Sequence, residues 1–289
     1  GGVVARVAYV SLDPYVGSRL RGRHMGESPP APMSEPIPGA IVARVAQSRA
    51  AGLEEGDWIY SMAGGWAESV ALDSAACRRI DIAIAPPAAY LGALGMPGLT
   101  AWAGTTQLAA VGPGDIFLVD SAAGAVGGAA GQFARARGAA RVVGIAGGAR
   151  KCALVEQSYG FDACVDYKRA DWREALQRAL PDGLTAFFEN VSADMATIAL
   201  LHARPYARGV LCGLAAAYHD ATPSAHPINA GLIITKRARV MGLVVYDFFA
   251  RWDEFLAEAG PLARDGRLTI AEDIAAGLEN APALFERLM

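Results

Sequence analysis

The sequence predicts an α/β fold in which a doubly wound parallel sheet forms the larger of two lobes and a β-rich lobe forms the smaller. From Ala88 onward, apolar strand-like runs alternate with helix-like segments, the rhythm of a parallel sheet covered on both faces. Before Ala88, strand candidates follow one another without a long helical period. A glycine-rich turn at 121–128 also joins an apolar run to a small-residue helix, which is typical of such sheets.

Length and composition limit the number of domains and the kind of partner. At 289 residues the chain exceeds a typical single domain, which favours two lobes. No apolar run approaches the roughly 20 residues that span a bilayer, so no membrane is expected. A net charge of -3 gives no broad basic field, so nucleic acid is not an expected partner either.

The smaller lobe is expected to comprise residues 1–92. Its strand candidates are 3–10, 37–45 and 58–60, the last of which follows a Gly-Asp turn. The tail 265–289 leaves the alternation that precedes it, and we expect it to return to this lobe.

The larger lobe is expected to comprise residues 93–264. Six strands and five helices in alternation fit a Rossmann domain. The predicted strands are 116–120, 141–146, 163–166, 185–189, 208–213 and 239–246, and the predicted helices are 125–137, 149–159, 170–179, 193–203 and 250–265.

The turn after the first of these strands resembles a dinucleotide fingerprint. Ala122 takes the first glycine position, Gly124 stands where the backbone approaches a pyrophosphate, and Gly127 stands where helix and strand pack closely. Backbone N–H groups and the positive end of a helix meet there, so the turn predicts a phosphate site. Ordinary packing of a small-residue helix on a sheet is the alternative interpretation.

The segment 146–151 indicates which dinucleotide binds. A protein that binds NAD usually carries Asp or Glu about 20 residues after the turn, but this segment, with Gly147 inside it, has no acid. Arg150 and Lys151 instead offer positive charge to a 2′-phosphate, and the Tyr167 hydroxyl can add a donor. NADPH is therefore favoured over NADH. A solvated helix face is the alternative interpretation of the Arg-Lys pair, and packing against the sheet is that of the tyrosine.

The cysteines do not form a recognisable pattern. Cys77, Cys152, Cys164 and Cys212 lack both the paired spacing of a zinc lobe and the density of a disulfide scaffold. We expect four reduced thiols in a cytoplasmic protein, and no metal.

Several segments together resemble one family, the zinc-independent medium-chain dehydrogenases/reductases of the leukotriene B4 12-hydroxydehydrogenase, or prostaglandin/alkenal reductase, type. The most specific segment is the run around Leu94-Gly95-Met96-Pro97-Gly98-Leu99-Thr100. The resemblance extends over nearly the whole chain, through 9–15, 90–102, the glycine turn, 160–162, 166–168, 190–191, 212–213, 236–239 and 277–282.

The resemblance implies a GroES-like catalytic lobe beside the Rossmann lobe, a homodimer joined through the sheet edge, and a small enone or enal as substrate. The implied activity is NADPH-dependent reduction of the carbon–carbon double bond of α,β-unsaturated ketones or aldehydes, without a metal. By position, the family's cofactor contacts correspond to Gly124, Ala125, Val126, Lys151, Tyr167, Asn190, Cys212 and Gly213, and its aromatic near the substrate carbonyl corresponds to Tyr246.

Three departures from the family pattern stand out. The family's first β-segment and its last strand, with an asparagine that touches the cofactor, have no counterpart before Gly1 or after Met289. Among the four residues that follow Tyr15, where the family usually has Met-Arg-Gly-Arg, only Arg19 keeps its match. Ser192 replaces a glycine, which is expected to narrow the cofactor cleft slightly.

Hydride addition to the β-carbon of an enone places negative charge on the carbonyl oxygen, so the site needs a donor at that oxygen. Tyr246 is the candidate, with an aromatic wall as its alternative role. Tyr15 is a candidate for the substrate side, or else a packed turn residue. His219 and His226 lie in a long loop and are assigned no role.

Other functions remain open at this point. A zinc-independent NADPH quinone reductase would share the turn but not the 94–100 segment. A non-catalytic NADPH-binding sensor would bind the cofactor without turnover, and a zinc alcohol dehydrogenase agrees least with the residues.

Overall fold

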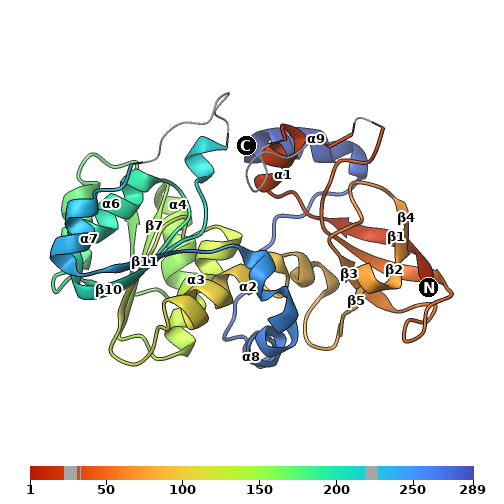
Figure 1. Cartoon of the computed structure of the whole chain (residues 1–289), viewed down its shortest axis with the longest axis horizontal. Helices are drawn as coiled ribbons and strands as arrows, with labels where there is room; N and C mark the ends of the chain where they lie inside the picture. Colours follow the sequence, from red (N-terminus) through yellow and green to blue (C-terminus); the bar gives the residue numbers. More distant parts are fainter. Residues whose placement is uncertain (23–30, 33, 219–226) are drawn as a thin grey trace. The chain divides into compact units, whose positions relative to one another are not determined.

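The computed structural model describes residues 1–22, 31–32, 34–218 and 227–289. The chain divides into two compact units, each with its own sheet (Figure 1). The first is built mainly from Gly1–Leu91 and Glu272–Met289, and the second mainly from Gly92–Ala217 and the chain up to Ala271. None of the described helices has the length and apolar character needed to cross a membrane.

A five-stranded antiparallel sheet forms the first unit's centre. Alternate residues of its strands, such as Val3 and Ala5, face a core that also contains Ile41 and Ile59. In spatial order the strands are β4 (Ser69–Asp73), β1 (Gly2–Val10), β2 (Ile41–Ser48), β3 (Trp58–Ser61) and β5 (Arg78–Arg79).

Within the described part of this unit, the α-helices are α1 (Tyr15–Leu20) and α9 (Ala281–Leu288). Phe285 of α9 meets the Trp66 ring edge-on at 5.7 Å between centroids. The strand predicted from residue 37 begins only at Ile41, because the Ile37 carbonyl accepts a hydrogen bond from Trp66 N–H (2.8 Å) and is used by a loop.

A six-stranded parallel sheet forms the centre of the second unit, which confirms the predicted α/β class. The chain moves outward from β6 through β7 to β8, then crosses back to start β9 on the other side of β6. The strands in spatial order are β11 (Arg239–Gly242), β10 (Ala203–Leu211), β9 (Leu184–Glu189), β6 (Ile116–Val119), β7 (Arg141–Ala146) and β8 (Ala163–Asp166).

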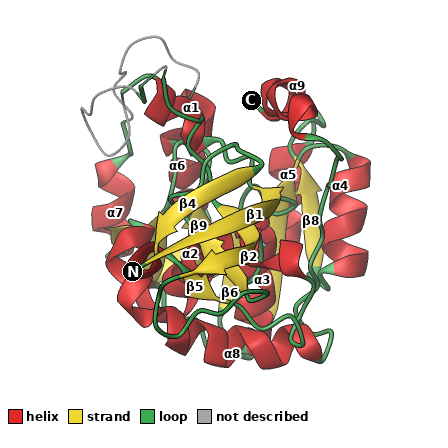
Figure 2. Cartoon of the chain, turned by 90° about the vertical axis from the view of Figure 1, so that its right-hand side faces the viewer, coloured by secondary structure: helices red, strands yellow, loops and turns green. Residues whose placement is uncertain are grey.

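Helices cover both faces of this sheet, and α4 and α5 lie along β8 (Figure 2). Leu176 of α5 and Leu200 of α6 pack on the face that carries Leu118, while Trp102 and Phe133 of α2 and α3 pack around an aromatic from α8. The helices are α2 (Met96–Trp102), α3 (Ala125–Ala136), α4 (Ala149–Ala153), α5 (Trp172–Ala179), α6 (Ala193–Leu201), α7 (Ala230–Lys236) and α8 (Trp252–Arg264).

In this sheet, two strands have bounds that differ from the predicted ones by more than one residue. β10 begins at Ala203, because Ala203 already pairs with β9. The register of this pairing then shifts before Arg208, in a stretch where Tyr206 has a φ of 68°. β11 ends at Gly242, four residues before the prediction. Leu243 N–H still bonds to Leu211 of β10 (2.9 Å), and a 3₁₀ helix then begins at Val245.

Candidate functional site

The glycine-rich turn joins the end of β6 to the start of α3. Ser121 has a φ of 46°, and its carbonyl accepts a hydrogen bond from Gly124 N–H (2.8 Å). Ala122 N–H donates to Ile145 of the neighbouring strand β7 (3.0 Å). A Cβ at Gly127 would lie 2.4 Å from the Ser121 carbonyl oxygen. Only glycine therefore lets the first turn of α3 approach the preceding turn so closely.

The N-terminus of α3 is suited to hold a phosphate group. Gly124 occupies the N-cap, and among the described residues no side chain caps the helix. The N–H groups of Ala125, Val126 and Gly127 belong to the first helical turn, which has no acceptor within the helix. Such N–H groups, together with the helix dipole, bind anions. The turn thus fits a pyrophosphate.

A second glycine turn follows β7. Gly148 has a φ of 95°, and its N–H donates to Asp166 Oδ1 (2.7 Å), which also accepts from Lys168 N–H (3.0 Å). These two bonds, the one from Gly148 above all, hold the pKa of Asp166 below its usual range. Asp166 was not among the predicted site residues, although its position as an acid at the end of an apolar strand is a usable indication of such a role.

Tyr167 covers this turn from the end of β8. Its hydroxyl oxygen lies 2.9 Å from where a Cβ on Gly147 would stand, and its side chain is half exposed. Arg150 and Lys151 are exposed in the short helix α4 that begins at Ala149. Two cations and a phenol therefore stand next to the Gly147–Gly148 turn.

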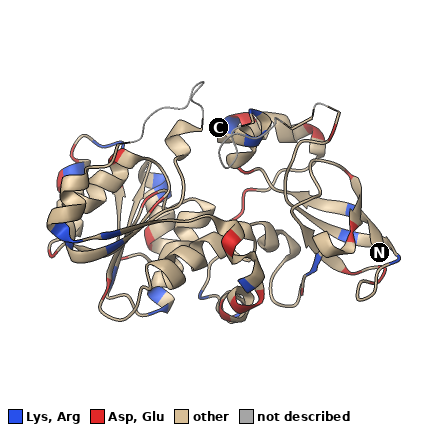
Figure 3. Cartoon of the chain, in the orientation of Figure 1, with Lys and Arg blue, Asp and Glu red and all other residues tan. Residues whose placement is uncertain are grey.

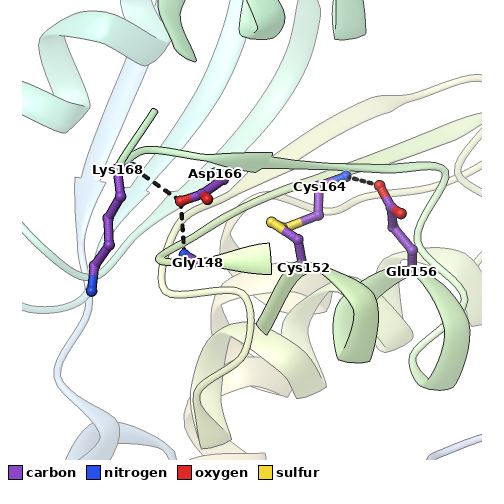
Figure 4. The surroundings of a disulfide bond; sticks show 6 residues. All are labelled: Gly148, Cys152, Glu156, Cys164, Asp166 and Lys168. Carbon is purple, nitrogen blue, oxygen red and sulfur yellow. Dashed lines mark hydrogen bonds between the residues drawn. A yellow bond between two sulfur atoms is a disulfide. The ribbon is translucent and has the colours of Figure 1, made fainter. Parts of the chain in front are cut away.

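A disulfide bond joins Cys152 of α4 to Cys164 of β8, directly beside this turn (Figure 4). The expectation of four reduced thiols is therefore wrong for this pair, while Cys77 and Cys212 are free. The two residues are 12 positions apart, but β8 lies next to β7 in the sheet and α4 follows β7, so their Cα atoms lie 5.1 Å apart. The spacing of the two cysteines in the sequence does not indicate this contact, because the contact depends on which strands are neighbours in the sheet.

Replacing Cys152 by serine is expected to lower the free energy of unfolding by about 2–3 kcal/mol, because the bridge restricts the unfolded chain. Urea unfolding under oxidising conditions measures the difference, and a dithiol reductant should remove it. Cys77→Ser, at a free cysteine, is the matched control and should change stability little. Equal stability of the wild type and Cys152→Ser would contradict the prediction.

The ends of β6, β9 and β10 bring a third group of predicted residues together. Asn190 follows β9, and its backbone N–H donates to Asp120 Oδ1 (2.7 Å) at the end of β6. Cys212 N–H donates to the Glu189 carbonyl (2.8 Å), so Cys212 and Gly213 follow the end of β10 beside Asn190. Burial raises the pKa of the Cys212 thiol to about 12, with further contributions from the charges of Asp120 and Glu189.

Ser192 has a local role that the sequence analysis did not foresee. Its hydroxyl accepts a hydrogen bond from Met195 N–H (3.2 Å) and caps α6. The serine thus stabilises the start of the helix that follows Asn190.

The two tyrosines proposed for the substrate side lie in different units. Tyr246 falls in the 3₁₀ helix Val245–Arg251 and meets the Phe249 ring edge-on at 5.2 Å between centroids. Tyr15 is the first residue of α1. His219 and His226 lie outside the described residues.

Charged groups are dispersed over the ribbon, with Lys and Arg interspersed among Asp and Glu (Figure 3). Within the described ranges, no three His, Cys, Asp or Glu side chains come together in a group that could hold a metal ion.

Comparison with known proteins places this geometry in a family. A family model described as zinc-binding dehydrogenase matches residues 125–260, and one described as the N-terminal domain of oxidoreductase matches residues 1–80. The NADP(+)-dependent 2-alkenal reductase of Nicotiana tabacum is 35% identical over 285 residues, which cover 97% of this chain and 81% of the relative. The NADPH-dependent curcumin reductase of Escherichia coli is 33% identical over 297 residues, or 100% of this chain and 84% of the relative. The chain belongs to the zinc-independent medium-chain dehydrogenases/reductases.

Solved structures of other medium-chain dehydrogenases/reductases share the fold. CurA from Vibrio vulnificus in complex with NADPH has a TM-score of 0.89 and 32% identity, covering 100% of this chain and 86% of that one. The Escherichia coli quinone oxidoreductase complexed with NADPH has a TM-score of 0.79 at 19% identity, covering 99% of this chain and 87% of that one, and shows the fold alone.

Proposed function

We propose that this medium-chain dehydrogenase/reductase uses NADPH to reduce the carbon–carbon double bond of α,β-unsaturated ketones or aldehydes. The observation that carries the proposal is the similarity, over almost the whole chain, to reductases named for NADP(H) and for an alkenal or curcumin. A (+)-pulegone reductase from Mentha piperita, 32% identical over 98% of the chain, adds a third relative. The protein is accordingly an NADP-dependent oxidoreductase.

Three groups of residues would hold the cofactor. The first turn of α3, from Gly124 to Gly127, would bind the pyrophosphate through backbone N–H groups. Lys151 and Tyr167 would bind the 2′-phosphate, with Gly147 beneath the tyrosine. Asn190, Cys212 and Gly213 would line the nicotinamide end, because Asn190 follows β9 where the strand order reverses and Cys212 is bonded to the end of the same strand.

The chain's own residues would then stabilise the developing enolate. When bound, NADPH supplies the hydride for the β-carbon. The Tyr246 phenol would donate a hydrogen bond to the carbonyl oxygen, where negative charge develops, and Tyr15 would contribute to substrate binding. A donor already fixed in place needs no reorganisation at the moment of reaction.

The test is oxidation of NADPH and, separately, of NADH with a short alkenal, a long-chain enone, a bulky aryl enone and a quinone, with product identification. NADPH-selective formation of the saturated carbonyl compound supports the proposal. Turnover of the quinone alone would instead support a quinone reductase, and NADPH binding without turnover would support a sensor.

Replacing Lys151 by alanine is expected to raise KM for NADPH about 10–100-fold and to leave KM for NADH nearly unchanged. The physical reason is the loss of a charge-assisted hydrogen bond, typically about 1.5–3 kcal/mol, to a phosphate that NADH lacks. Steady-state kinetics with both cofactors measures the change. Lys236→Ala, in the last turn of α7, is the matched control. Equal losses with both cofactors would show that Lys151 does not read the 2′-phosphate.

Two further expectations stay predictions. A homodimer would form through β11, which is one of the two edge strands of the six-stranded sheet. A monomeric mass in solution would exclude it. The cytoplasmic location is tested by cell fractionation.

A further inference from the structure

Two acidic side chains meet where the strand order of the parallel sheet reverses. Asp120 directly follows β6, and Glu189 is the last residue of the neighbouring strand β9. They are 4% and 2% exposed, and their carboxyl groups interact with each other. Within the described residues, Asp120 Oδ2 and Glu189 Oε2 are buried without another hydrogen-bond partner.

A retained proton accounts for this arrangement. Two carboxylates buried in contact would repel each other and leave both oxygens unsatisfied, whereas a proton on one of them donates a hydrogen bond to the other. Burial, followed by the hydrogen bond and the charge of Asp120, raises the pKa of Glu189 to about 9. The pair therefore holds one proton at neutral pH.

Among the described residues, the groups that face the pair from neighbouring elements carry no positive charge that would offset the negative charge of the two carboxyl groups. They are the Cys212 thiol after β10 and the backbone N–H groups of 190–192. The thiol stays protonated because its pKa is about 12. Among the described residues, no cation contributes to the pKa shift of either carboxyl group.

The remaining oxygens of the pair hold the loop after β9. Asp120 Oδ1 accepts from the backbone N–H of Asn190 at 2.7 Å and from its side-chain amide at 3.2 Å. Glu189 Oε1 accepts from the backbone N–H groups of Val191 (2.7 Å) and Ser192 (2.6 Å). Asp120 is also the residue before Ser121, where the phosphate-binding turn begins. The pair thus joins both loops at the reversal point.

We propose that Asp120 and Glu189 are positioning residues whose shared proton fixes the Asn190 loop against the glycine-rich turn, so that NADPH binding requires that proton. The inference rests on the cofactor site of the proposed function. Loss of the proton at alkaline pH places two negative charges in contact and breaks the connection between the loops. If only the protonated pair binds, the apparent Kd rises in inverse proportion to the protonated fraction, which falls about tenfold per pH unit above the pKa of the pair.

The experiment measures Kd for NADPH from nucleotide fluorescence between pH 7 and pH 10.5 for the wild type, Glu189→Gln and Glu174→Gln. The glutamine amide can donate to Asp120 and its carbonyl can accept from Val191 and Ser192, but it does not titrate. We expect Glu189→Gln to bind within about threefold of the wild type at pH 7 and to lack the wild type's rise above pH 9. Glu174, exposed on α5, is the matched control, and its variant should keep the rise.

Two outcomes would overturn the inference: a wild-type Kd that does not rise above pH 9, or the same rise in Glu189→Gln. The glutamine variant keeps every other alkaline group, so a rise that it shares comes from elsewhere. Failure of the wild type to bind NADPH at pH 7 would refute the cofactor site, whereas normal binding without enone turnover would refute only the proposed reaction.

The pH dependence of protein stability tests the shared proton in the absence of NADPH. A carboxyl whose pKa is higher in the folded protein than in the unfolded chain binds more protons when folded, so its contribution to stability is lost as pH rises. The unfolding midpoint of the apo protein should therefore fall from pH 6 to pH 9, and Glu189→Gln should reduce this fall. Parallel midpoint curves for the wild type and the variant would contradict the shared proton.

Discussion

Replacing Gly127 by alanine is expected to weaken NADPH binding about 100-fold. The added Cβ would lie 2.4 Å from the Ser121 carbonyl oxygen and 2.7 Å from that of Asp120, and neither backbone atom can turn away. The first turn of α3 must therefore shift, and its N–H groups then no longer point toward the pyrophosphate in hydrogen-bonding geometry. Loss of about two hydrogen bonds to a charged group corresponds to this factor.

Titration of NADPH fluorescence measures the effect, and circular dichroism verifies that the variant is folded. Gly112→Ala is the matched control, because a Cβ there has nothing within 4 Å. Gly124→Ala provides a milder case, since its Cβ would meet only the Ser121 residue, at 3.0 Å from Oγ and 3.1 Å from the carbonyl oxygen. An unchanged Kd in a folded Gly127→Ala protein would exclude this turn as the pyrophosphate site.

Replacing Tyr246 by phenylalanine is expected to lower kcat for enone reduction about 100-fold while Kd for NADPH stays within a factor of about two. Removing one donor to a developing oxyanion typically costs about 10²–10³ in kcat. Phenylalanine keeps a ring in place for the edge-on contact with Phe249 (5.2 Å), so packing changes little.

Single-turnover and steady-state kinetics with the same enone separate chemistry from binding. Tyr206→Phe, at an exposed tyrosine of β10, is the control and should leave kcat unchanged. If kcat survives in Tyr246→Phe, the tyrosine is only an aromatic wall and the donor to the carbonyl oxygen is another group.

The sheet of the second unit could be predicted where apolar runs are bounded by turn residues. The strands at 141–146 and 163–166 have the predicted bounds for this reason. β10 begins earlier than predicted because Pro205 and Tyr206 interrupt the apolar pattern while Ala203 still pairs with β9. The helix α7 was not predicted because its apolar run is only Leu232 to Ile234 within a seven-residue helix.

The sequence predicts those parts of the candidate site that are formed by residues close together in the chain. The turns at 124–127 and 147–151 are local features, so composition and spacing indicate them. Asp120 and Glu189 are far apart in the sequence, and only the pairing of β6 with β9 brings them together. The disulfide was not predicted because it depends on the pairing of β7 with β8, which brings Cys164 next to α4. A usable signal for the acids was present, since each stands at the carboxyl end of an apolar strand.

The tight turn after β7 limits how this enzyme could be re-engineered or evolve toward NADH. An acid that binds the adenosine ribose would have to enter near 147 or 148. At Gly147 an added Cβ would stand 2.9 Å from the Tyr167 hydroxyl oxygen, so the half-exposed tyrosine ring would have to move aside, and at Gly148 the φ of 95° penalises every residue except glycine. An acid at 147 therefore also displaces Tyr167, which is one of the two groups proposed to bind the 2′-phosphate. The two nucleotide preferences are thus coupled through one turn.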